Sequence, residues 1–340
     1  MSNDAEAQIT LASLLLGGVV SQMVAAIAKV GIPAQLADGA KSAEELAHTL
    51  ELQVEPTYRL LRGLTVYGVV EESDASHFSL TTLGRQLLPD AANSLHPLAR
   101  LVGESFHARS FLALESCLRS GKSGFLTVHG LGIFDWLAQH PRETAVFANA
   151  MEGFSAPEVE LIVAAWDFAS ARRIADIGGG SGKLLAGILR AHPSAHGLLF
   201  DQESVLTEAR QLLQREAVLE RCELCVGSFF AELPGGCDTY LLKHVLHDWS
   251  DERARAILLQ VARAMTPSST LLIIEQVMSD APVPEPAKFL DVFMLALTEG
   301  GRERTHAQHR ALLESAGLRL EQLVTTASPL RLIVARLAER

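Results

Sequence analysis

A short glycine-rich segment carries the clearest chemical signal in this chain. Residues 174–183 read IADIGGGSGK, in which one acid, Asp176, precedes glycines at alternate positions, Gly178, Gly180 and Gly182. An apolar run that ends in such glycines and leads into a helix brings bare backbone amides close to a nucleotide-like ligand. The segment therefore predicts a bound cofactor as the starting point of the chemistry. A purely structural turn is the alternative interpretation.

The residues that this segment lacks narrow the choice of cofactor. A dinucleotide-binding G-x-G-x-x-G/A pattern that starts at Gly178 needs a small residue at position 183, where the chain has Lys183. A phosphate-binding P-loop that ends at Lys183 needs glycine at 177 and a hydroxyl at 184, where the chain has Ile177 and Leu184. An acid in the loop suits an ammonium group better than a pyrophosphate. The pattern resembles the cofactor loop of S-adenosylmethionine-dependent methyltransferases.

Two further polar positions follow expected strands. Asp201 comes directly after the apolar run 196–200, where a ribose hydroxyl would find its acceptor, although a helix cap is an alternative role. The run LLKHVLHDWSD at 241–251 places His247 just past another strand end. An imidazole there could take a proton from an acceptor group, whereas helix capping is the plainer interpretation. His244, three residues earlier, is interpreted as structural.

Several separated motifs together resemble one enzyme family. With Glu275 in the run IEQ and GGRERT at 300–305, the sequence resembles the small-molecule O-methyltransferases related to plant caffeate and flavonoid enzymes, including bacterial secondary-metabolite members. The resemblance spans nearly the whole chain. It implies methyl transfer from S-adenosylmethionine, with S-adenosylhomocysteine as product and no metal, to a phenazine-, polyketide- or flavonoid-like phenol. N-methylation and a non-methylating reaction on the same scaffold are the alternatives.

The resemblance also implies roles for individual residues. His247 matches the general base, and Glu275 and Glu303 match carboxylates that flank its ring. The positions that match cofactor contacts are Asp176, Gly178, Gly180, Gly182, Asp201, Ser228, Phe229 and Lys243. The family often has an acid where this chain has Ser228, so the adenine hydrogen bond is expected to differ. The expected substrate contacts are Met151, Phe154, Asp248, Phe293, Met294 and Leu297, for most of which core packing is an alternative explanation.

The elements that must position these residues alternate between strands and helices. The expected strands are 173–177, 196–200, 224–227, 239–242 and 271–275, with helices at 183–190 and 251–265 between them. This rhythm predicts an α/β fold with a Rossmann-like, doubly wound sheet, helices on both faces and ligands at the carboxyl ends of the strands. We expect a catalytic domain over 96–340, made of a helical substrate region, 96–170, and a cofactor-binding core, 171–340.

The first 95 residues are expected to form a separate, mostly helical domain. A capping box at Ser42–Glu45 opens a helix to residue 50, a second helix covers 55–67, and a hairpin covers 69–80. This winged-helix order occurs in many DNA-binding proteins. The second helix carries Arg59 and Arg62, but no basic cluster follows, and a net charge of −11 disfavours a phosphate-rich partner. We therefore expect a dimerisation module and a homodimer, with a DNA-binding regulator as the remote alternative.

Composition and the N-terminal segment set the remaining limits. A chain of 340 residues with 48% hydrophobic content can bury a large core. Residues 8–28 carry no charge, but recurring small and polar residues predict a buried helix packed on a second subunit instead of a membrane span. The preceding flank is acidic, unlike a signal peptide, so a cytoplasmic location is expected. The four cysteines, including the pair Cys222 and Cys225, are expected to be reduced and without zinc.

Overall fold

The computed structural model of the protein describes residues 3–73, 76–91, 93–155 and 157–339. It divides into two compact units. Unit 1 comprises Met1–Ala108 and Leu137–Phe154, and unit 2 comprises Arg109–Trp136 and Ser155–Arg340. This division differs from the single expected boundary after residue 95, because the chain returns to unit 1 for one helix. In that helix Gly153 lies so close to Ser94 that an added Cβ would be 3.3 Å from the Ser94 carbonyl oxygen.

Unit 1 combines helices with a small antiparallel sheet. Its helices are α1 (Asn3–Val30), α2 (Ile32–Gln35), α3 (Ala43–Thr49), α4 (Val54–Thr65), η2 (Gly84–Leu87), α5 (His96–Val102) and α10 (Pro141–Ser155). Its sheet has the order β1-β3-β2, from β1 (Lys41–Ser42), β2 (Val70–Ser73) and β3 (His77–Leu80). The expected capping box is confirmed: the Glu45 amide donates to Ser42 Oγ at 3.1 Å, and the Ser42 amide donates to the Glu45 carboxylate at 2.7 Å.

Helix α1 is only partly buried within a single chain. Its C-terminal half contributes Ala25, Ile27 and Ala28 to the core, but its N-terminal half exposes many apolar side chains, among them Leu14 and Leu15, which are 73% and 75% exposed. By length and composition the segment Asp4–Val30 could cross a membrane, and only 17% of its most apolar window is buried. Within a single chain this half of α1 therefore has little to pack against.

Unit 2 is a layered α/β structure. Its helices are α6 (Ser105–Leu112, which begins in unit 1), α7 (Leu114–Ser120), α8 (Gly124–His129), α9 (Ile133–Leu137), α11 (Glu158–Ala165), α12 (Lys183–Ala191), α13 (Glu203–Arg215), η3 (Leu219–Arg221), η4 (Leu246–Asp248), α14 (Asp251–Ala264), α15 (Pro286–Leu297) and α16 (His306–Ser315). Its strands are β4 (Arg173–Ile177), β5 (His196–Asp201), β6 (Cys222–Val226), β7 (Thr239–Lys243), β8 (Thr270–Met278), β9 (Arg304–Thr305), β10 (Leu318–Thr325) and β11 (Leu330–Leu337). The five expected strands and both expected helices are present.

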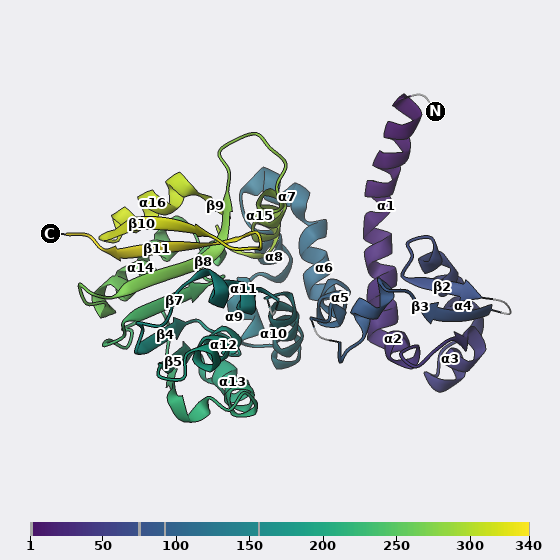
Figure 1. Ribbon diagram of the computed structural model, residues 1–340. Coiled ribbons are helices and arrows are strands. Elements are labelled where there is room, and N and C mark those ends of the chain that lie inside the picture. The colour runs from purple at the N-terminus through teal and green to yellow at the C-terminus, as the bar shows by residue number, and fades with distance from the viewer. Residues whose placement is uncertain (1–2, 74–75, 92, 156, 340) are drawn as a thin grey trace. The chain divides into compact units, whose positions relative to one another are not determined.

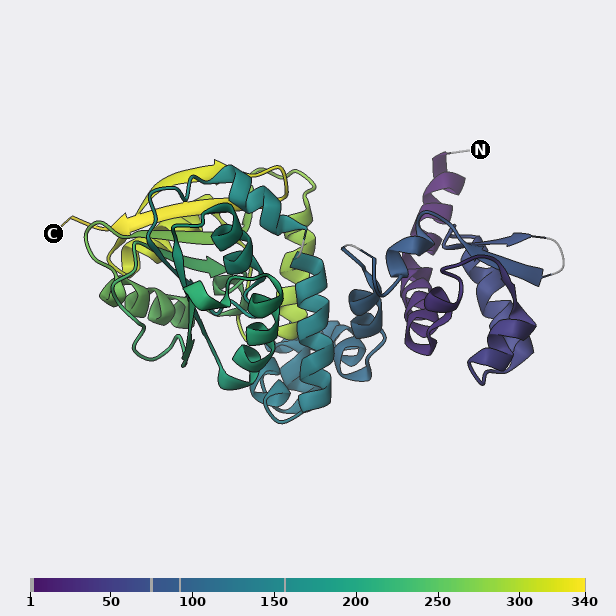
Figure 2. The same cartoon turned by 60° about the horizontal axis from the view of Figure 1, so that its bottom comes forward.

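The main sheet is mixed and covered on both faces. Its order is β10-β11-β8-β7-β4-β5-β6, with β9 paired to β8 outside this path. Strands β4 to β8 are mutually parallel, whereas β11 runs antiparallel to β8 and β10 antiparallel to β11. Helices lie on both faces (Figures 1 and 2). The strands are near-continuous apolar runs because both of their faces are buried.

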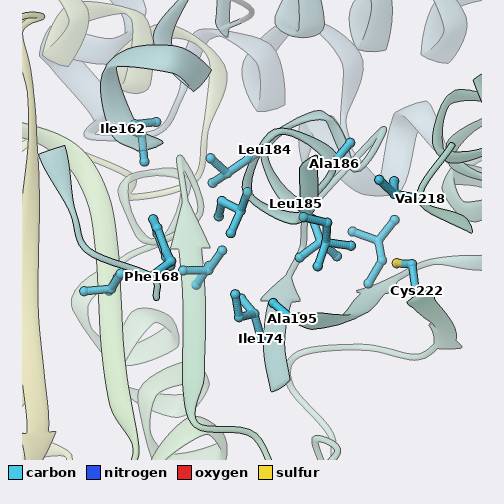
Figure 3. Close-up of a cluster of buried hydrophobic side chains, with 14 of the residues drawn as sticks. Ile162, Phe168, Ile174, Leu184, Leu185, Ala186, Ala195, Val218 and Cys222 are labelled. Carbon is cyan, nitrogen blue, oxygen red and sulfur yellow. The ribbon is translucent and has the colours of Figure 1, made fainter. Parts of the chain in front are cut away.

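Alternate residues of each strand supply two separate cores. In β4, Ile174 belongs to the core under α11, α12 and α13, while Ala175 and Ile177 belong to the core under α14 and α16. Figure 3 shows part of the first core, which includes Leu184 and Leu185 of α12 and Ile174 of β4. This alternation places Asp176 on the α12 side of the sheet, because side chains two apart on a strand share a face.

The four cysteines are free thiols. Cys222 and Cys225 both lie on β6, three residues apart, so their side chains point to opposite faces of the sheet. Cys117, Cys222 and Cys237 are buried, and Cys225 is half-buried.

The order of the central strands creates the crevice in which a ligand can bind. Strand β4 lies between β5 and β7, so the chain leaves the carboxyl end of β4 towards one side and that of β7 towards the other. Open α/β sheets bind ligands at such a switch point. Register places Asp176 opposite Leu241 and Lys243 opposite Ile274. The segments that follow β4, β7 and β8 are therefore neighbours at one edge of the sheet.

Candidate active site

Three glycines shape the loop between β4 and α12. Gly178, Gly180 and Gly182 all have positive φ angles, of 67°, 60° and 77°, a region that residues with a side chain rarely adopt. Gly178 is also closely packed, because an added Cβ would lie 3.2 Å from Val245 and 3.4 Å from Phe229. The loop ends at Gly182, directly before α12, so it presents backbone N–H groups at a helix N-terminus. The loop thus has the backbone conformation that the predicted cofactor cradle requires, and its contact with the cofactor stays a prediction.

Two carboxylates lie on either side of this loop. Asp201 holds it in place, because the Gly180 amide donates to one carboxylate oxygen at 2.9 Å and the Gln202 amide to the other at 2.7 Å. Asp176 is 1% exposed, and neither of its oxygens has a hydrogen-bond partner. Burial raises the pKa of Asp176 to about 7. An unpaired buried carboxylate is costly, so the two Asp176 oxygens are open to hydrogen bonds from a ligand, and the cofactor contact of Asp176 stays a prediction.

Further predicted cofactor residues gather at the same edge. Phe229 packs against the Gly178 backbone and at 5.9 Å from the Trp249 ring. Ser228 Oγ accepts a hydrogen bond from the Phe230 amide at 3.3 Å. The Lys243 ammonium pairs with Glu158 of α11 at 2.8 Å. Its contact with adenine stays a prediction, because in this structure the ammonium is engaged by an acid.

His247 lies in η4, the single turn after β7, and is buried together with two acids from distant segments. Its Nδ1 is 2.7 Å from Oε1 of Glu303, whose side chain is wholly buried. Glu275, on β8, accepts a hydrogen bond at 3.0 Å from the His247 backbone N–H and does not touch the ring in this way. The structure thus brings the three residues together, but one glutamate holds the ring and the other holds the main chain.

A third carboxylate faces the opposite side of the ring. Asp248 Oδ1 is 3.7 Å from His247 Nε2, the nitrogen that Glu303 leaves free. Burial alone would lower the pKa of His247, but the charges of Asp248 and Glu303 outweigh it and raise the pKa to about 10. Glu275 adds to this upward shift. His247 is therefore an imidazolium at neutral pH and, once deprotonated, a strong base.

The segment 300–304 encloses the His247 turn, a role that the sequence interpretation missed for every residue except Glu303. The Arg302 amide donates to the His247 carbonyl at 2.8 Å. Arg304, whose side chain is wholly buried, donates to the carbonyls of Leu246 at 2.9 Å and Trp249 at 2.8 Å. A Cβ on Gly301 would meet the His247 carbonyl oxygen, which explains the glycine there. The motif was visible in the sequence, but its contacts depend on the fold.

The predicted substrate contacts fall into both units. On α15 the ring of Phe293 packs edge-on against Phe111 at 4.9 Å, while Met294 and Leu297 are each 7% exposed. Met151 and Phe154 lie on α10 of unit 1, and the side chain of Phe154 is outside the described part of the chain, so the substrate contacts of both stay predictions. Among the residues that the structure describes, no cluster of His, Cys, Asp or Glu side chains could hold a metal ion.

Comparisons with known proteins agree with this geometry. The O-methyltransferase domain family matches residues 111–319, and its dimerisation domain matches residues 12–90. The chain belongs to this O-methyltransferase family. It is 35% identical over 338 residues to mitomycin biosynthesis 6-O-methyltransferase from Streptomyces lavendulae, covering 98% of this chain and 96% of the relative. It is also 35% identical to phenazine O-methyltransferase PhzM from Lysobacter antibioticus, covering 98% of both.

One relative of this O-methyltransferase has a different acceptor atom in its name. Phenazine-1-carboxylate N-methyltransferase from Pseudomonas aeruginosa is 31% identical and covers 96% of both chains. Among solved structures, that of LaPhzM matches with a TM-score of 0.94 and 34% identity, covering 97% of this chain and 99% of the other. A second solved structure is an O-methyltransferase from neocarzinostatin biosynthesis in complex with S-adenosylmethionine and 2-hydroxy-5-methyl naphthoic acid. It matches with a TM-score of 0.82 and 28% identity, covering 94% of this chain and 96% of the other.

S-adenosylmethionine is the cofactor of this O-methyltransferase. The residues present fit it, because Asp176 offers two unpaired buried oxygens beside a cradle of positive-φ glycines. The dimerisation domain supports a homodimer. In one chain the N-terminal half of α1 is exposed, so its expected burial against a second subunit stays a prediction.

Proposed function

We propose that this O-methyltransferase methylates a phenolic hydroxyl of an aromatic, polycyclic secondary metabolite, with His247 as general base. The observation that supports this proposal best is the orientation of the His247 ring. Glu303 binds Nδ1 at 2.7 Å, so Nε2 is left for an acceptor hydroxyl. The carboxylate holds the ring and stabilises the imidazolium that forms when Nε2 takes the proton.

The surrounding acids make this proton transfer feasible. S-adenosylmethionine supplies an electrophilic methyl group on a sulfonium, which an acceptor oxygen attacks in line. With an ordinary imidazole pKa, removing a proton from a phenol of pKa about 10 is uphill by roughly 5 kcal/mol. A His247 pKa of about 10 matches the pKa of such a phenol, so proton transfer to the neutral ring is close to isoenergetic. At pH 7, however, only about one His247 ring in 1,000 is neutral, so the rate with ordinary phenols depends on pH. With a phenol that is already ionised at neutral pH, the His247 imidazolium can bind the phenolate directly.

The proposed acceptor is flat and apolar. Phe293 and Phe111 form an edge-on aromatic pair in unit 2, and Met294 and Leu297 follow on the same helix, α15. We propose that these α15 residues, with Asp248 and with Met151 and Phe154 from α10, contact the substrate. The names of the mitomycin and phenazine relatives support a polycyclic ring system. Polar groups that would single out one hydroxyl are not part of this proposal.

Cofactor binding is proposed for the residues around the glycine loop. The residues are Asp176, Gly178, Gly180, Gly182, Asp201, Ser228, Phe229 and Lys243. Their position at the sheet switch point supports this role. Asp201 keeps lone pairs for ribose hydroxyls beyond its two amide contacts, and Ser228 offers a hydroxyl where the family often has an acid.

The protein is further proposed to act as a cytoplasmic homodimer without nucleic-acid or membrane partners. In the winged-helix part of unit 1, Arg59 lies 3.3 Å from Glu55 and Arg62 lies 3.8 Å from Glu72. Each arginine on the helix that would face DNA is thus beside an acid. A gel-shift assay at low salt with mixed duplexes is expected to show no complex.

The decisive experiment is transfer of labelled methyl from S-adenosylmethionine to a panel of mono- and polycyclic phenols, with His247→Ala alongside. Loss of a general base should lower kcat by about 10²- to 10⁴-fold on ordinary phenols. Acidic phenols, which are already ionised, should be much less affected. Equal losses on both groups would contradict the base role and indicate a steering role instead. Label found on a ring nitrogen, unaffected by His247→Ala, would indicate N-methylation.

A further inference from the structure

A second histidine lies against the proposed base. His244 follows β7 directly and has a left-handed backbone, with φ of 53°, while its amide donates to the Ile274 carbonyl at 3.1 Å. Its ring lies over that of His247, with the centroids 5.2 Å apart and the planes at 29°. The backbone conformation of His244 is what brings the ring there. One face of the His247 ring is therefore covered by another imidazole.

An acid from a different layer of the fold holds this second histidine. Oε2 of Glu158, the first residue of α11, is 3.2 Å from His244 Nε2 and 2.8 Å from Lys243 Nζ. The three side chains are between 11% and 18% exposed. One carboxylate oxygen thus holds Lys243, the last residue of β7, and His244, the residue after it. Through His244 it holds the ring that covers His247.

We propose that Glu158 and His244 form a positioning pair for His247. Glu158 fixes the plane of the His244 ring, and that ring in turn fixes the plane of His247 and keeps water from its face. The proposal rests on the base role of His247 given above, but it concerns residues that this role does not use. His244 is interpreted here as a positioning residue, in place of the structural role expected from sequence.

The details of His244 argue for more than space filling. A left-handed backbone is uncommon for residues other than glycine, although asparagine, aspartate and histidine adopt it more often than the rest, and such conformations gather at functional sites. His244 Nδ1 is buried and has no hydrogen-bond partner. An apolar side chain would avoid the buried unpaired nitrogen, and glycine would also relieve the backbone. Retaining an imidazole here is explained by the two contacts that its ring makes, with Glu158 and with His247.

The charge states of the two rings are compatible with stacking. Burial lowers the pKa of His244 to about 4, and the Lys243 ammonium acts in the same direction, so this ring is neutral when His247 is charged. Like-charge repulsion between the rings is thereby avoided. The other charged or titratable groups around the two rings are Glu158, Asp248, Glu275, Glu303, Arg304 and His309.

The test compares His244→Asn with His196→Asn. Asparagine tolerates the left-handed backbone but removes the stacked ring, and His196 is an exposed histidine at the start of β5 that serves as the matched control. We expect His244→Asn to lower kcat about tenfold and to leave KM within about twofold, because the ring of the base is less well aligned. The control should match wild type in both.

A second readout does not depend on methyl transfer. In protein with ¹⁵N-labelled histidine, the imidazole signals of His247, identified by their loss in His247→Ala, report its titration. In His244→Asn water reaches the ring and weakens the pull of the surrounding acids, so the His247 pKa should fall by about one unit. Glu158→Gln keeps an oxygen acceptor and should remain near wild type, whereas Glu158→Ala should behave like His244→Asn.

The outcomes separate the two proposals. An unchanged His247 titration and an unchanged kcat in His244→Asn would overturn the positioning pair. The positioning pair would also be overturned if the His247 titration were unchanged and the fall in kcat were fully explained by loss of folded protein or of cofactor affinity. Failure of the base role would be seen in the methyl-transfer assay, where His247→Ala would methylate ordinary phenols at the normal rate. The titration of His247 tests the pair even in that case.

Discussion

The glycine loop and the His247 turn lie at the same edge of one sheet, yet they are built in opposite ways. The loop after β4 uses backbone conformation, with three positive-φ glycines in five residues. The turn after β7 uses side-chain charges that come from β8, the segment before β9 and α11. One site is local in the sequence, whereas the other pairs His247 with Glu303, 56 positions away, and His244 with Glu158, 86 positions away.

This contrast has an energetic origin. A backbone cradle binds through N–H groups and shape, so it fails when a side chain forces a different φ. A charge cluster works through distances and burial, so it changes gradually as each charge is removed. We therefore expect substitutions in the loop to abolish binding and substitutions around His247 to change rate and pH dependence.

The largest effect is expected for Gly178→Val in the loop. A β-branched side chain is strained at φ of 67°, and its Cβ would lie 3.2 Å from Val245. Strain and overpacking together should cost about 4 kcal/mol, or roughly 1,000-fold in affinity for S-adenosylhomocysteine by calorimetric titration. Gly180→Ala is also strained, at φ of 60°, but has open space around its Cβ, so it has the backbone cost without the overpacking and should lose less affinity. Normal binding by Gly178→Val would show that the loop is not the cradle.

An intermediate effect is expected at the glutamates, and it distinguishes ring contact from backbone contact. Glu303→Gln removes the charge at His247 Nδ1 and should lower kcat about 100-fold. Glu275→Gln, which can still accept from the His247 backbone N–H, should lower kcat about tenfold. Steady-state kinetics at saturating cofactor measure both, and cofactor affinity should not change. Equal effects would mean that the two contacts are not different in function.

The smallest effect is expected when the pH of the assay is changed by one unit. Because the pKa of His247 is raised to about 10, the neutral base becomes tenfold more abundant with each pH unit up to that value. For a phenol of ordinary pKa, kcat/KM should therefore rise about tenfold per unit between pH 7 and 9. An acidic phenol should give a flat profile over this range, because its phenolate meets the imidazolium that is already present. A plateau near pH 7 with ordinary phenols would contradict the raised pKa.

The loop could be predicted from sequence because its determinants are consecutive. Glycines at alternate positions after an apolar run specify backbone conformations, and the structure shows all three with positive φ. The five parallel strands and the capping box at Ser42 were predicted for the same reason, since periodicity and caps are local features. Strands β10 and β11 were not predicted, because their pairing with β8 is a tertiary contact.

The chain of contacts around His247 depended on the fold. The sequence determined that a histidine follows a strand end and that glutamates occur at 275 and 303, and the family resemblance linked them. Only the tertiary structure decided that Glu303 binds the ring, that Glu275 binds the backbone, and that His244 lies over the base. The physical reason is that hydrogen bonds and pKa shifts depend on distances of a few ångströms and on burial, which chain folding creates between segments that the sequence keeps far apart.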